Sequence, residues 1–111
     1  MKIPESTKGS LEQKLRTRQR ERWPRLREIR VRYRGEFAYA DAVMTDGETS
    51  PLFRLRYAGR ASVFGFATHL RSREGYEDSV LPNGPFGATP QDTLDFACGL
   101  YLADPSALVT N

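Results

Sequence analysis

The 111-residue chain is poor in the residues that build cross-links and metal sites, with one cysteine and one histidine. Because a single Cys98 cannot close an internal disulfide, this cysteine usage favours a reducing cytoplasm. The chain lacks a close cluster of zinc-ligand residue types, so we expect neither a metal site nor a cofactor. It also lacks a run of 18 apolar residues and an apolar segment near Met1. We therefore expect no transmembrane helix, no secretory signal and no membrane partner.

Motifs of catalytic chemistry are missing from the sequence as well. His69 is the only imidazole, and no motif supplies a nucleophile or carboxylate to pair with it. The stretch 84–87 lacks the lysine and the serine or threonine of a phosphate-binding loop. Cys98 lies on the apolar stripe of a predicted helix, an arrangement typical of a buried, inert thiol. We expect a protein that is not an enzyme.

Charge is present in quantity but is distributed unevenly. Residues 1–36 contain twelve lysines or arginines and five glutamates, whereas residues 37–111 contain five arginines and nine acidic residues. The first segment therefore has a net charge of +7 and the second −4, which favours a basic surface that meets a polyanion. A GC-rich genome also raises arginine usage without selection for binding, and the sequence does not separate these two causes.

The N-terminal segment predicts a tail followed by a basic helix. Residues 1–9 are mixed and polar, which favours a mobile tail. Ser10 is a suitable N-cap for a helix from Leu11 to about Arg22, because a Trp-Pro pair follows and disfavours helix. Apart from Leu11 and Leu15 the helix has no apolar stripe, so we expect it to sit at an edge of the fold or to extend away. Its arginines spread around the helix: Arg16, Arg18, Arg20 and Arg22.

Alternation of apolar and polar residues from residue 29 onward predicts β-strands separated by turns. Gly35-Glu36 is typical of a two-residue hairpin turn, and Asp46-Gly47 is a second turn signal. The predicted strands cover 27–34, 37–44, 52–57, 62–70 and, as a short fifth, 76–81.

The clearest predicted element is a C-terminal helix. Thr89 is a good N-cap and Pro90 suits the first helical position. Apolar residues then recur at helical spacing through Cys98, and Asp104-Pro105 ends the helix. The chain is thus predicted to be one α+β domain over 10–105, with a tail over 106–111. Its fold is a mostly antiparallel four- to five-stranded sheet with this helix on one face and a basic N-terminal helix.

The turns fix how the strands align, and three of them predict the same apolar face. The first hairpin sets Arg34 opposite Phe37, Arg32 opposite Tyr39 and Arg30 opposite Asp41. The second sets Ala40 opposite Phe53 and Ala38 opposite Leu55. A four-residue turn over 58–61 sets Leu55 opposite Phe64 and Phe53 opposite Phe66. We expect the C-terminal helix to cover this face: Ile29, Val31, Tyr33, Ala38, Ala40, Ala42, Phe53, Leu55, Tyr57, Phe64 and Phe66.

The opposite face collects arginines and aromatic rings. Arginine matches phosphate geometry and stacks on planar groups, and basic surfaces with aromatics hold nucleic acids. We hypothesise binding of DNA or RNA through this face, with Tyr39 and Phe37 as stacking surfaces and the basic helix as an auxiliary arm. An ordinary solvated sheet face is the competing interpretation. The candidate nucleic-acid-binding residues are Arg30, Arg32, Arg54, Arg56, Tyr39, Phe37, Arg16, Arg18, Arg20 and Arg22.

Four stretches carry a resemblance to other proteins: Arg54-Leu55-Arg56-Tyr57, Phe64-Gly65-Phe66-Ala67, Tyr76-Glu77-Asp78-Ser79, and Thr89-Pro90-Gln91 with Ala97-Cys98-Gly99-Leu100-Tyr101-Leu102. From Trp23 to Pro105 the chain resembles a family of short proteins from high-GC Gram-positive bacteria that has no established function. The resemblance implies no activity and no site.

A second similarity is in layout. HicB-type antitoxin domains place a strand meander before a Gly-x-Thr-x-x-Ala-Leu helix entry. The run from Gly87 through Thr89 to Leu94 is similar to that entry but has Thr93 where alanine is usual. This similarity implies an interaction protein. The sequence thus predicts a small cytoplasmic, non-enzymatic binding protein for nucleic acid. The alternative is a protein-interaction module, antitoxin-like or self-associating as a homodimer, without a nucleic-acid role.

Overall fold

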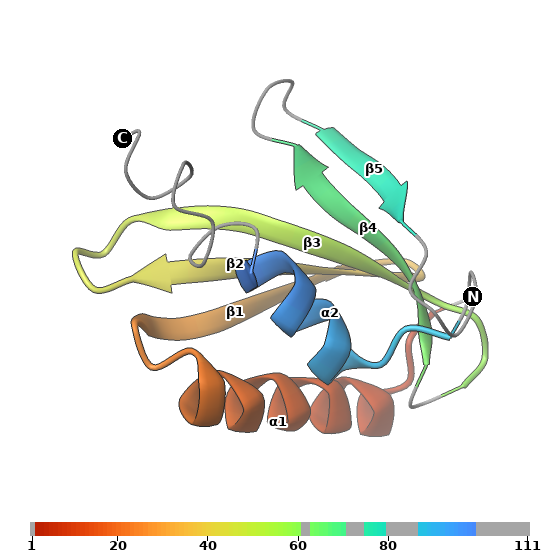
Figure 1. Ribbon diagram of the computed structural model, residues 1–111. Helices are drawn as coiled ribbons and strands as arrows, with labels where there is room; N and C mark the ends of the chain where they lie inside the picture. Colours follow the sequence, from red (N-terminus) through yellow and green to blue (C-terminus); the bar gives the residue numbers. More distant parts are fainter. Residues whose placement is uncertain (1, 61–62, 71–74, 80–86, 100–111) are drawn as a thin grey trace.

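The computed structural model describes residues 2–60, 63–70, 75–79 and 87–99 (Figure 1). The sheet has the order β1-β2-β3-β4-β5, and every neighbouring pair is antiparallel. The predicted α+β layout is therefore confirmed. The elements in chain order are α1 (Glu5–Arg22), β1 (Leu26–Arg34), β2 (Phe37–Met44), β3 (Thr49–Tyr57), β4 (Phe64–Leu70), β5 (Gly75–Ser79) and α2 (Pro90–Cys98).

Helix α1 begins earlier than the sequence predicts. Its N-cap is Pro4, and residues 5–9 form its first turns, so the tail predicted over 1–9 and the N-cap predicted at Ser10 are wrong. The reason is tertiary: Ile3 is 3% exposed and packs in the core, which anchors the chain before the helix starts. Glu5 in the first turn also suits the positive end of the helix dipole.

The docking of α1 is tighter than predicted. Leu11 and Leu15 are fully buried, and Thr7 and Gln19 extend the same stripe at four-residue spacing. The Gln19 side-chain amide donates to the carbonyls of Trp23 and Leu26, at 3.1 and 2.8 Å. These bonds satisfy polar groups at the turn into β1 that would otherwise be unpaired. The helix lies over the edge strand β1 and beside α2 rather than extending away (Figure 1).

The first hairpin has the predicted register. Gly35 has a φ of 61° and Glu36 follows it with a negative φ, as a type II′ turn requires. Arg30, Arg32 and Arg34 therefore lie opposite the predicted residues of β2.

The second hairpin reaches its predicted register by a different route. Its loop has three residues, Thr45 to Gly47, and Gly47 has a φ of 91°. This shifts the pairs beside the turn by one residue. An irregularity at Leu52 shifts the register back, so Ala40 and Phe53 lie opposite each other as predicted.

The predicted register between β3 and β4 is wrong by two residues. Leu55 pairs with Phe66 and Tyr57 with Phe64, because the connection spans 58–63 rather than 58–61. A shift of two keeps every side chain on its predicted face. The core is therefore the predicted one, with the alanines of β2 leaving room for the helices. The predicted face and helix residues that are at most 5% exposed are Ala38, Ala40, Ala42, Phe53, Leu55, Phe64, Phe66, Leu94, Ala97 and Cys98.

Helix α2 has the predicted cap. The Thr89 hydroxyl oxygen accepts a hydrogen bond from the Asp92 amide at 3.2 Å, and Pro90 begins the helix. The predicted continuation to Asp104, the tail over 106–111 and the end of the fifth strand at 80–81 lie outside the described residues. In Figure 1, α2 crosses in front of the sheet with α1 alongside it. Both described helices therefore cover the apolar face, and neither of them covers the arginine-bearing face.

Candidate nucleic-acid interface

The arginine-bearing face of the sheet, here named the open face, consists of rows of residues that pair across neighbouring strands. Arg32 on β1 pairs with Tyr39 on β2, and Tyr39 pairs with Arg54 on β3. In the next row Phe37 lies between Arg34 and Arg56. The predicted residues of these three strands therefore come together on one surface: Arg30, Arg32, Arg54, Arg56, Tyr39 and Phe37.

The open face is concave. In a flat sheet, β2 and β5 would be three strand spacings apart, about 14 Å. The rings of Tyr39 on β2 and Tyr76 on β5 nevertheless have their centroids 5.5 Å apart. The sheet must therefore curl toward the open face, and Figure 1 shows β4 and β5 running at a steep angle to β1–β3. Small residues on β4, Gly65 and Ala67, leave room for the rings inside the curl.

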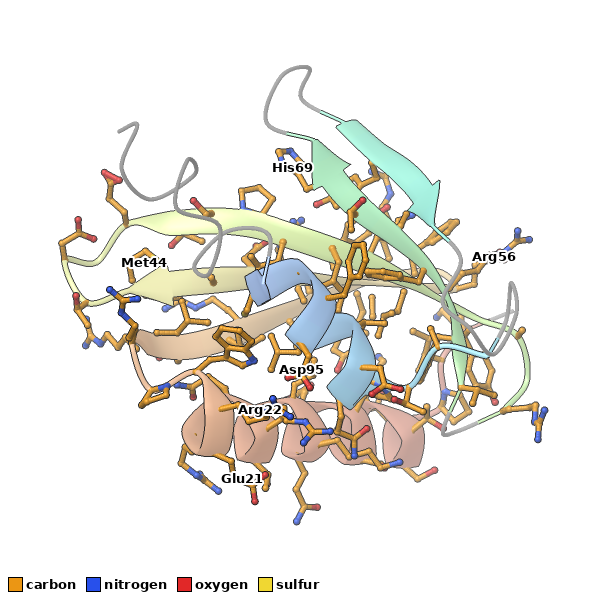
Figure 2. The ribbon with its side chains drawn as sticks, viewed as in Figure 1. Glu21, Arg22, Met44, Arg56, His69 and Asp95 are labelled. Carbon is orange, nitrogen blue, oxygen red and sulfur yellow. The ribbon has the colours of Figure 1, made fainter. Side chains whose placement is uncertain are left out.

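Four rings line this concave face in succession. Phe37 contacts Tyr39 with centroids 6.2 Å apart, and Tyr39 meets Tyr76 edge to face. Tyr76 in turn contacts His69, with centroids 5.2 Å apart. Figure 2 shows His69 near the far end of β4. Edge-to-face pairs of this kind favour defined ring orientations, so the rings form a preorganised surface.

Guanidinium groups lie over these rings. The Arg54 guanidinium carbon is 4.7 Å from the centroid of Phe37 and 5.6 Å from that of Tyr76. The Arg32 guanidinium carbon is 5.2 Å from the centroid of Tyr39. Cation–π contacts of this length hold the planar cations against the sheet. The open face therefore presents both aromatic and guanidinium planes.

Within the described residues, carboxylates pair with Arg30, Arg32 and Arg56. Arg32 binds Asp41 through two bonds of 2.9 and 3.3 Å, and Arg30 binds Glu28 at 3.2 Å. Arg56 binds Glu36, and Figure 2 shows the Arg56 side chain extending outward from the fold. The hydrogen bond that Glu36 accepts from Arg56 lowers the pKa of Glu36, and the hydrogen bond that Arg32 donates to Asp41 raises the pKa of Arg32. These pairs reduce the net positive charge of the face while fixing where its cations lie.

The arginines of α1 do not belong to this face. Tyr33 points to the covered side of β1 and its hydroxyl donates to Glu12 of α1 at 2.5 Å, so α1 lies on the far side of the sheet from the open face. Arg18 and Arg22 lie 3.6 and 3.7 Å from Asp95 of α2. The structure therefore does not bring the predicted auxiliary arm together with the open face: Arg16, Arg18, Arg20 and Arg22.

The contacts around Asp95 serve a structural role. The Trp23 indole N–H donates to Asp95 at 2.9 Å, from the end of α1 to α2. Figure 2 shows Asp95 and Arg22 facing each other between the two helices. The carboxylate thus gathers one indole and two arginines, and it ties α1 to α2.

One contributor to the open face, Tyr76, was missed from the sequence, and one, Asp41, was placed on this face with another partner. Tyr76 lies in a predicted strand, and its signal was the β4–β5 hairpin, whose register places it opposite His69. Asp41 was placed opposite Arg30, but it binds Arg32 on the diagonal. The hairpin register was a usable signal for Tyr76, whereas the diagonal pairing depends on side-chain rotamers that no sequence pattern reports.

An open hollow lies at the β1 end of this face. Its volume is about 440 Å³, and it is lined by Arg32, Tyr33, Arg34, Tyr39 and Tyr76. Arginine is a donor only, and tyrosine hydroxyls donate readily. Burial raises the pKa of Tyr76, and the Asp41 carboxylate adds to the shift, so this hydroxyl stays protonated at neutral pH.

Other kinds of site do not emerge from the described ranges. Across residues 2–60, 63–70, 75–79 and 87–99, His, Cys, Asp and Glu form no group of three that would hold a metal ion. Burial raises the pKa of the Cys98 thiol to about 12, which suppresses the reactive thiolate. Neither helix in the described part is long and apolar enough to cross a membrane. No protein-family model, curated protein or solved structure matches the chain.

Proposed function

We propose that the protein binds single-stranded nucleic acid on the concave open face. The carrying observation is that Phe37 and Tyr39 of β2 and Tyr76 of β5 form one aromatic surface with guanidinium groups over it. Successive unpaired bases stack on such planes while cations follow the phosphates. In a duplex the base faces are stacked inside the helix, so a concave aromatic surface favours the unpaired strand.

The ion pairs on the open face leave its arginines able to bind phosphate. Arg32 and Arg56 have side chains that are more than half exposed, so an incoming phosphate reaches them without unfolding the sheet. Each guanidinium has five N–H donors, so a phosphate can bind the donors that the carboxylate leaves free. The carboxylates, of which Asp41 is only 9% exposed, keep the arginines ordered in the free protein.

The test is a salt-titrated fluorescence anisotropy series on labelled single-stranded and duplex oligonucleotides. For a single strand the log–log slope of affinity against salt is about −0.7 per phosphate contact. Arg54→Ala should reduce the steepness by about one contact, and Tyr39→Ala should weaken binding by ~1–3 kcal/mol if a base stacks there. Arg54→Lys keeps the charge but not the plane, so an intermediate loss separates stacking from charge.

The control is Arg16→Ala, which removes one positive charge from the other side of the sheet. The affinity for the oligonucleotide should change by no more than the loss of one unit of net charge explains. Absence of binding at low salt overturns the proposal. So does unchanged affinity after Arg30, Arg32, Arg54 and Arg56 are all replaced by alanine.

A further inference from the structure

The hollow at the β1 end of the open face has a lining with a defined chemistry. Arg32 and Arg34 line it together with Tyr39 and Tyr76, and the described lining residues include no carboxylate, the one bound to Arg32 belonging to Asp41. Arginine donors favour an anion, and the half-buried rings of Tyr39 and Tyr76 favour a planar group. A ligand that matches both halves of this lining is planar at one end and anionic at the other.

The lining is fixed before any ligand arrives. Asp41 holds Arg32 through two bonds, and Arg32 lies over the ring of Tyr39. The ring of Tyr39 is in turn held edge to face against Tyr76, with centroids 5.5 Å apart. Ordering the lining in the free protein reduces the entropy lost on binding.

Arg34 differs from the other arginine of the hollow. It is exposed at the end of β1, and no carboxylate of the described ranges lies within ion-pair distance of it. A phosphate on Arg34 therefore displaces no described partner. The hollow also opens at β1, an edge strand, which is where a bound strand would enter or leave the concave face.

We propose that the hollow holds a single phosphorylated nucleotide, with its phosphate on Arg34 and its base against Tyr39 and Tyr76. This proposal rests on the proposed function where the nucleotide is the phosphorylated end of a bound single strand. A free nucleoside monophosphate has the same chemistry, and the two sources are separated by experiment.

The test measures competition by adenosine and uridine 5′-monophosphates, and it compares oligonucleotides with and without a 5′-phosphate. We expect the monophosphates to bind and the 5′-phosphate to tighten oligonucleotide binding. Arg34→Ala should weaken monophosphate binding by about tenfold or more and abolish the preference for the 5′-phosphate. Tyr76→Leu should also weaken monophosphate binding, because it removes the ring, whereas Tyr76→Phe should preserve most of it.

Controls separate this proposal from simpler ones. Arg20→Ala removes an exposed charge on α1 and should leave monophosphate binding unchanged. Inorganic phosphate that competes as well as the monophosphates would show an anion site without a base and overturn the proposal. Circular dichroism of each variant verifies folding, and Arg34→Ala keeps the test valid if Tyr76→Leu unfolds.

The two proposals fail in different ways. If oligonucleotides bind but monophosphates do not compete and Arg34→Ala keeps the 5′-phosphate preference, the hollow is not a nucleotide site and the proposed function stands. If monophosphates bind through Arg34 and no oligonucleotide binds, the hollow is a free-nucleotide site and single-strand binding is wrong.

Discussion

The two faces of this sheet use alternate residues of the same strands and are stabilised by different physics. The covered face packs alanines and phenylalanines against two helices, and its Phe53, Leu55 and Phe64 are at most 1% exposed. The open face has rings and arginines that contact one another under partial exposure. Burial of apolar area stabilises the first, whereas the second depends on cation–π contacts and ion pairs of small individual value. The difference shows which face can change without loss of the fold.

The largest expected effect lies on the covered face. Phe66 is 5% exposed and contacts Phe53 and Phe96 at centroid distances of 5.9 and 5.6 Å. Phe66→Ala should lower the free energy of unfolding by roughly 3–5 kcal/mol, because it removes buried area and leaves a cavity. The matched change Phe37→Ala on the open face should cost about 1 kcal/mol or less. Urea denaturation measures both, and equal losses would refute the distinction between the faces.

The contrast between the faces was readable from the sequence because period-two alternation keeps each side chain on its face when the register error is an even number of residues. The β3–β4 register was wrong by two residues, yet Leu55 and Phe66 kept their faces. The helix start was not readable, because burial of Ile3 anchors α1 and the stripe it buries includes the polar Thr7 and Gln19.

The candidate site was predicted in part. Its arginines and two of its rings follow from alternation, but the curl of the sheet does not. That curl brings Tyr76 of β5 against Tyr39 of β2 and thereby creates the concave surface. Curvature is set by the packing of the whole sheet, and strand alternation reports only which side each residue is on. The placement of α1 on the far side of the sheet is likewise a tertiary result.

The second-largest expected effect is a pH dependence of the unfolding free energy, which arises from Cys98 on the covered side of the sheet. Burial raises the pKa of Cys98 from its ordinary 9.0 to about 12. The thiol therefore favours folding in its protonated form, and its contribution is complete below pH 9 and is lost as pH rises toward 12. Over that window stability should fall by up to about 1.4 kcal/mol per pH unit from this group. Cys98→Ala removes this contribution.

The measurement compares urea unfolding of the native protein and Cys98→Ala at pH 7, 9 and 10.5. The difference in unfolding free energy between the two proteins should shrink above pH 9. The pKa of Tyr33 is also raised by burial, but both proteins retain that residue, so its contribution cancels in the difference. A difference that stays constant to pH 10.5 would show that the Cys98 thiol is not sequestered in the folded state.

The smallest effect is expected on the open face, where two arginines of one strand should behave differently. Arg34 is exposed and has no ion-pair partner in the described part of the chain, so Arg34→Ala should change unfolding free energy by less than about 0.5 kcal/mol. Arg32→Ala should cost more, about 1 kcal/mol, because it leaves the Asp41 carboxylate, whose side chain is 9% exposed, without its two hydrogen bonds.

Urea denaturation at low and high salt separates the two variants. Salt should leave the small effect of Arg34→Ala unchanged, since no pair is screened, and should reduce that of Arg32→Ala only in part, because Asp41 is largely buried. A cost for Arg34→Ala as large as that for Arg32→Ala would mean that Arg34 supports the fold. Its lack of a partner would then no longer favour a role in phosphate binding. If Arg34→Ala is nearly neutral, Arg34 is a cation at the rim of a preorganised hollow that does not stabilise the fold. The nucleotide proposal requires this condition.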